Sequence, residues 1–120
     1  MVIEYLSEIF TKQRVLQKII QRKNPTRHIY KTEEPFLGYR IFFDIEAIEE
    51  ECKEIKRETG WKWWKQEKDK LDMDHIKEEV SDILFFTIKL CLDVGLEPPD
   101  LYKEYLKKLK TNEQRQENNY

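Results

Sequence analysis

The sequence predicts an all-α protein with a four-helix, bundle-type fold. Only three glycines and four prolines interrupt its 120 residues, and the segments between them have helical length. Within those segments, apolar residues recur at intervals of three and four, which is the period of an amphipathic helix. The length suits a single core, so residues 1–120 are expected to form one domain.

The first helix is expected from Ile3 to about Arg22. Its apolar residues keep the helical period along this stretch, and the pair Asn24-Pro25 stops the pattern. Residues 26–39 show no period and contain isolated aromatic residues. We expect them to form a connecting loop or a short irregular helix.

The second helix is expected from about Arg40 to Thr59, and Gly60 is well placed as its C-terminal cap. Its apolar residues follow a helical period and should face the core. This expected core stripe consists of Ile45, Ile48, Cys52 and Ile55.

The third helix is expected from about Asp74 to Val94, with Asp72 or Asp74 as its N-cap. Residues 83–92 are apolar nearly all round the helix, so this should be the central and most buried helix. A monomer needs a polar stripe on such a helix, and little is present. The chain is therefore expected to self-associate through a helical interface.

A fourth helix follows Gly95 and the pair Pro98-Pro99, which end the third. Leucine and tyrosine residues from Leu101 onwards support it. From Thr111 it is expected to fade into a polar tail.

Composition and charge exclude several classes of protein. The net charge of −2, with cations spread among acids, gives no broad basic field for non-specific binding to nucleic acid polymers. No apolar run approaches the length of a membrane span. Cys52 and Cys91 lie on expected helices, and the N-terminus lacks the features of a signal peptide. Reduced thiols in a cytoplasmic protein are expected.

Two acidic pairs of equal spacing are the main indication of function. Glu51 and Glu54 lie on the second expected helix, and Glu79 and Asp82 lie on the third. Residues three apart share a helix face, and each pair borders an apolar stripe, so two packed helices can bring four carboxylates together. Such oxygen ligands suit a divalent ion of the magnesium class. The alternative is that these acids lie on solvated faces, since the chain holds 24 acidic residues.

The segment 61–65, Trp-Lys-Trp-Trp-Lys, follows the first acidic pair and is called the Trp-Lys block below. Its indole rings can stack on a base, and its lysines can meet phosphate. The alternative is that the tryptophans pack in a core or an interface. His28 and His75 lack metal-ligand spacing with any cysteine, so surface or capping roles are expected for them.

The polar tail offers similar chemistry. Lys108, Asn112, Arg115 and Gln116 fall at helical spacings, which would place them together if the helix continued. The alternative is a frayed, solvated terminus.

These linked motifs resemble the all-α nucleoside-triphosphate pyrophosphatase superfamily, and within it the dimeric dUTPase branch, which is related to the MazG-like pyrophosphohydrolases. The two acidic pairs look like the family's metal-binding motifs, with the Trp-Lys block as the aromatic insert between them. The tail is similar to the family's late nucleotide-binding motif. The matching tail residues are Lys108, Asn112, Arg115, Gln116 and Tyr120.

Near the start of the chain, Gln13 and Gln17 look like the family's amide residues that contact the edge of uracil. An amide side chain can pair with both the donor and the acceptor groups of that base. Two positions depart from the pattern. Gln17 replaces an expected asparagine, and Phe85 stands where the branch usually has a histidine.

The resemblance implies a magnesium-dependent pyrophosphohydrolase that converts dUTP to dUMP and pyrophosphate as a homodimer. The two acidic pairs would hold one or more Mg²⁺ ions, and Glu51 would orient the attacking water. Lys65, Lys108 and Arg115 would stabilise phosphate charge, while Trp61 or Trp64 would flank the base.

Two alternatives remain open. The first is a house-cleaning or dCTP-directed pyrophosphatase of the same fold, because an amide can turn to suit uracil or cytosine. The second is a non-enzymatic helical interaction protein, whose tryptophans form a partner interface. Family members usually continue beyond the position of Tyr120 into a further motif, so either the chain is truncated or a partner chain supplies those contacts.

Overall fold

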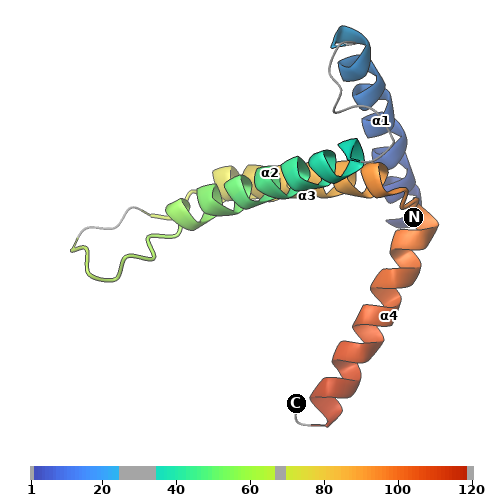
Figure 1. Ribbon diagram of the computed structural model, residues 1–120. Coiled ribbons are helices and arrows are strands. Elements are labelled where there is room, and N and C mark those ends of the chain that lie inside the picture. Colours follow the sequence, from blue (N-terminus) through green and yellow to red (C-terminus); the bar gives the residue numbers. More distant parts are fainter. Residues whose placement is uncertain (1, 25–34, 67–69, 119–120) are drawn as a thin grey trace.

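The structure is a computed structural model that describes residues 2–24, 35–66 and 70–118 (Figure 1). These residues form four α-helices and no strand, which confirms the all-α prediction. Among them, no helix is long and apolar enough to cross a lipid bilayer. The helices are α1 (Val2–Lys23), α2 (Phe36–Glu58), α3 (Met73–Val94) and α4 (Pro98–Glu117).

Helices α1 and α3 begin and end within a residue or so of the expected positions. Asp72 caps α3 by accepting a hydrogen bond from the backbone N–H of His75. At the other end, Gly95 adopts a left-handed φ of 79°, where a glycine is favoured, and closes the helix. Both caps were recognisable in the sequence because they depend on local chemistry.

The start of α2 and the extent of α4 differ from expectation. Helix α2 begins four residues earlier, at Phe36, because Pro35 precedes it and Gly38 is accommodated inside the helix. Helix α4 begins at Pro98 and continues through the expected tail to Glu117. Glu97 and Asp100 cap its start reciprocally, and this capping box explains the early beginning.

Helices α2 and α3 lie side by side and antiparallel, while α1 crosses one end of this pair and α4 leads away from the same end (Figure 1). A small apolar core fills the crossing. Phe10 of α1 meets Ile88 and Cys91 of α3 there, and leucines of α1, α3, α4 and the connection before α4 pack around them. The central position expected for the third helix is confirmed, since α3 packs against both α2 and α1.

Only part of the expected apolar stripe of the second helix is covered in α2, since Ile48, Cys52 and Ile55 are half-buried. Ile45 is 39% exposed, and the buried residues of α2 are Arg40 and Asp44. The reason is that α2 turns a polar stripe towards α3. In one chain, much of its apolar surface therefore has no packing partner among the described residues.

The α2–α3 contact is a polar seam with a regular register. Arg40 pairs with Asp93 at 3.2 Å, Asp44 pairs with Lys89 at 2.6 Å, and Glu58 pairs with His75 at 3.3 Å. The number of residues between successive partners on α2 equals the number between their partners on α3, counted in the opposite direction. Steps of three and four keep a stripe on one helix face, so the same register holds along the whole pair.

The seam end nearest α1 holds a charge cluster made of Arg40, Asp44, Lys89 and Asp93. Lys89 bridges both carboxylates, lying 2.6 Å from Asp44 Oδ1 and 3.0 Å from Asp93 Oδ2. Burial and the nearby Asp93 raise the pKa of Asp44 to about 7, although Lys89 acts in the opposite direction. The ammonium group of Lys89 is therefore needed to hold two carboxylates at this position.

We expect Lys89→Met to destabilise the fold by about 3–5 kcal/mol, because it leaves Asp44 and Asp93 together without their shared cation. Urea unfolding followed by circular dichroism would measure this change. The control is Lys53→Met, which breaks an exposed pair with Glu50 and should cost less than about 1 kcal/mol. Equal losses in the two variants would show that the cluster does not stabilise the α2–α3 pair.

Candidate metal centre

The opposite end of the polar seam brings the two acidic pairs together. The register places Glu51 opposite Asp82 and Glu54 opposite Glu79. One carboxylate oxygen from each of Glu51, Glu79 and Asp82 lies within 4.8 Å of the others. Glu54 is close enough to change the pKa of both glutamates. The four residues are called the acidic cluster below.

The close approach of carboxyl groups within the acidic cluster raises the pKa of two of its members. The carboxyl groups of Glu54 and then Glu51 raise the pKa of Glu79 to about 7. Burial raises the pKa of Glu51, with a further contribution from Glu54, although the contact with Glu79 acts in the opposite direction. The folded chain thus holds these carboxylates together at an electrostatic cost.

The donor set of the acidic cluster fits a divalent cation. Glu79 is only 7% exposed, and the buried Oε2 atoms of Glu51 and Glu79 have no hydrogen-bond donor among the described residues. Converging carboxylate oxygens are the ligands that Mg²⁺ and similar hard cations prefer. A bound cation would give those oxygens a partner and offset the repulsion between them.

His75 borders the acidic cluster. This position was not expected from the sequence, which indicated a surface or capping role. Its Nε2 atom lies 3.2 Å from Glu79 Oε1 and 3.3 Å from Glu58 Oε1. The signal was present in the spacing, because His75 stands four residues before Glu79, and Glu58 stands four after Glu54. The imidazole holds one oxygen of Glu79, so it orients that carboxylate.

The Trp-Lys block lies just beyond the C-terminal end of α2. This is the end of the α2–α3 pair that is far from α1 (Figure 1). All three indoles are more than half exposed. Trp64 makes edge-to-face contacts with Trp61 and Trp63, at centroid distances of 5.6 and 5.9 Å. Lys62 lies 5.7 Å from the centre of the Trp61 ring, and Lys65 is exposed. The block therefore packs chiefly on itself and leaves ring surface available for a ligand.

Gln13 and Gln17 lie on the α1 face that crosses α3. Gln13 is buried and donates a 2.7 Å hydrogen bond from Nε2 to the carbonyl oxygen of Phe85. Phe85 stands one helical turn after Asp82, which places Gln13 close to the acidic cluster. Gln17 is half-buried, and its Nε2 atom has no partner among the described residues.

The expected tail residues are not brought to the acidic cluster of their own chain. Lys108, Asn112 and Arg115 are exposed on α4. This helix starts at the end of the α2–α3 pair that α1 crosses, and it points away from the pair (Figure 1). Tyr120 and His28 lie outside the described residues. Within one chain, α4 therefore does not bring the tail to the acidic cluster (Figure 1).

Comparison with known proteins agrees with this geometry. A family model described as dUTPase matches residues 5–99, a span that includes Gln13, the acidic cluster and the Trp-Lys block. No curated protein and no solved structure matches the chain. The match covers well over half of the 120 residues, and the helical content is that of an all-α dUTPase. The chain therefore belongs to this dUTPase family of all-α hydrolases.

Proposed function

We propose that the chain is a magnesium-dependent nucleoside triphosphate pyrophosphohydrolase that converts dUTP to dUMP and pyrophosphate. The observation that carries this proposal is the convergence of carboxylate oxygens from Glu51, Glu79 and Asp82, with Glu54 close enough to raise the pKa of both glutamates. Two buried oxygens of this group have no donor among the described residues. Membership of the dUTPase family supports a nucleotide substrate.

The acidic cluster would hold the metal. A divalent ion there would offset the charge of the phosphates and lower the pKa of a water molecule. Glu51 is the residue that would orient the attacking water, because its buried Oε2 has no donor and no cation contacts it among the described residues. Glu79, by contrast, is already held by His75.

The residues around the acidic cluster would bind the rest of the nucleotide. The Nε2 atom of Gln13 is engaged with Phe85, so its carbonyl oxygen would accept a hydrogen bond from the N3–H group of uracil. Gln17, the second amide expected at the base, lines a separate pocket that is described below. Lys65 would contact phosphate, and Trp61 or Trp64 would stack on an exposed face of the nucleotide.

A second copy of the chain would complete both the fold and the site. The radius of gyration is 18.1 Å, whereas a compact chain of this length has about 14 Å. Large apolar side chains remain exposed on each of the four helices, including Phe42 at 59% on α2 and Val80 at 54% on α3. A homodimer would cover such surface. It would also let α4 of one chain carry Lys108, Asn112 and Arg115 to the acidic cluster of the other.

We expect Glu51→Gln to reduce magnesium-dependent release of pyrophosphate from dUTP by a factor on the order of one hundred, because it removes a charged ligand while keeping the side-chain shape. The control is Glu50→Gln. Glu50 is exposed and pairs with Lys53, so this variant should keep near wild-type activity. A panel with dCTP and other triphosphates would test base selectivity. Equal activity of the two variants would contradict a catalytic acidic cluster.

Magnesium should stabilise the protein more at about pH 8 than at about pH 5.5. The pKa of Glu79 is raised from 4.5 to about 7 in the fold, so its contribution to stability is full below 4.5 and is lost as the pH rises through about 7. A bound cation favours the ionised form and reverses that loss. Thermal unfolding with EDTA or Mg²⁺ at both pH values would measure the effect.

The matched variants for this experiment are Glu79→Gln and Glu78→Gln. The first should lose most of the extra stabilisation by Mg²⁺ at the higher pH, whereas the second, an exposed neighbour, should keep it. Asp44 also has a raised pKa, but it is present in all three proteins and cancels in the comparison. The same magnesium response in Glu79→Gln and wild type would place the ion elsewhere.

Mixing two inactive variants would test the role of α4 in a dimer. Glu51→Gln lacks an intact acidic cluster, and Arg115→Ala lacks a tail cation. If α4 acts across the dimer, mixed dimers contain one complete site, and an equimolar mixture should regain about a quarter of wild-type activity. No recovery in a mixture shown to contain mixed dimers would place the tail in its own chain's site. Sedimentation showing only a 14.8 kDa species would contradict the dimer.

A further inference from the structure

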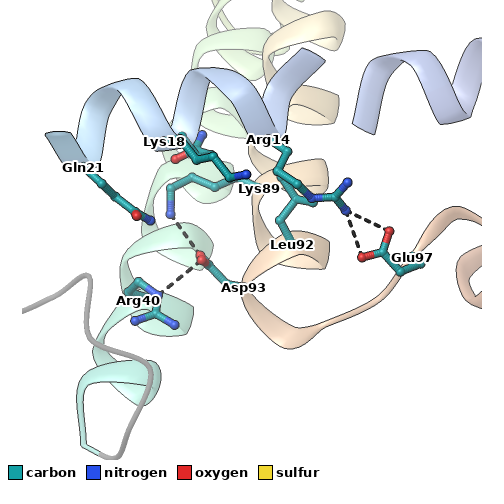
Figure 2. Close-up of a pocket in the computed structure, with 9 residues that line it drawn as sticks. Arg14, Lys18, Gln21, Arg40, Lys89, Leu92, Asp93 and Glu97 are labelled. Atoms are coloured by element: carbon teal, nitrogen blue, oxygen red, sulfur yellow. Dashed lines mark hydrogen bonds and ion pairs between the residues drawn. The ribbon is translucent and has the colours of Figure 1, made fainter. Parts of the chain in front are cut away.

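A second candidate binding site lies at the opposite end of the polar seam from the acidic cluster. It is a pocket of about 220 Å³ where α1 crosses α2 and α3 (Figure 2). Its charged lining residues come from all four helices or their caps. They are Arg14, Lys18, Arg40, Lys89, Asp93 and Glu97.

Among the described residues, the lining of this pocket carries an excess of positive charge, with four cations and two carboxylates. Figure 2 shows how the carboxylates are used. Asp93 lies between Arg40 and Lys89, at 3.2 and 3.0 Å, and Glu97 accepts two 2.8 Å hydrogen bonds from Arg14. The adjacent Asp44 pairs with Lys89 and offsets part of this charge. The pocket therefore favours an anion.

The lining of the pocket also contains hydrogen-bond donors that lack an acceptor among the described residues. Gln17 lines the pocket, and its buried Nε2 atom has no acceptor among the described residues. Lys18 is the neighbouring residue, and no ion pair of its ammonium group is present in the described part of the chain. A ligand rich in oxygen acceptors would satisfy the amide and the ammonium group together.

The size of the pocket limits the ligand. Its volume is about 220 Å³. This suits a small oxyanion and is below the roughly 300 Å³ at which sites for larger organic ligands begin. Lys89 stands seven residues after Asp82 on α3, which puts the two sites about 10 Å apart along the helix.

We propose that this pocket, formed by α1 and the cationic end of the seam, binds a small phosphate-class oxyanion without a metal ion. The inference goes beyond the proposed hydrolysis and does not depend on it. The acidic cluster repels anions unless a cation is bound, whereas the pocket has its own positive charge and its own donors. Binding in the absence of divalent ions thus separates the two sites.

The test is titration of the chelator-treated protein with inorganic pyrophosphate, followed by calorimetry at low ionic strength. Wild type should bind, and Lys18→Gln should bind at least about tenfold more weakly, because it removes a cation from the pocket. The matched control is Lys12→Gln, on the same helix but paired with Glu8 outside the pocket. It removes the same charge and should bind like wild type.

Glu51→Gln separates this proposal from the proposed function, because it alters the acidic cluster and leaves the pocket intact. It should bind pyrophosphate like wild type without metal, even if it no longer hydrolyses dUTP. Circular dichroism would verify that each variant is folded. Three results would overturn the proposal: no metal-free binding by wild type, equal weakening in Lys12→Gln and Lys18→Gln, or loss of binding in Glu51→Gln.

Discussion

The antiparallel register of α2 and α3 is the constraint on which the rest of the structure depends. Apolar side chains alone fix such a register weakly, because two helices that meet through apolar faces can shift along one another by one helical turn. Here Lys89 contacts Asp44 and Asp93 at once, and Arg40 also reaches Asp93. A slip by one turn would leave these buried charges without partners, which is far more costly than displaced methyl groups. The same register then sets the positions of the acidic side chains further along.

The two ends of the seam use one geometry for different purposes. Near α1, cations and carboxylates alternate across the seam and satisfy one another. At the far end, the carboxylates of Glu51, Glu79 and Asp82 converge with Glu54 nearby, and His75 contacts Glu79. Between them, the register places Ala47 opposite Phe86, an uncharged step that separates the two groups of charges. One end therefore stabilises the helix pair, and the other is left in need of a cation.

Local patterns in the sequence predicted much of this structure. Helix positions followed from periodicity and from caps such as Asp72 and Gly95, and the meeting of the two acidic pairs followed from equal spacing on adjacent helices. The buried side of α2 could not be obtained in this way. Periodicity assigns apolar residues such as Ile45 to the core, but here Arg40 and Asp44 are buried, because their partners on α3 satisfy them. The place of His75 likewise required knowledge of the register.

The register also determines where the chain can tolerate insertions and deletions. Each residue of a helix turns the chain by about 100°, so one deletion between Asp44 and Glu51 would rotate one half of α2 relative to the other. Either the acidic cluster or the charge cluster would then face away from α3. The connection after Gly60 is free of this restriction, since a change of length there leaves both helices in phase. Natural variation in length should thus accumulate between α2 and α3 and be rare within them.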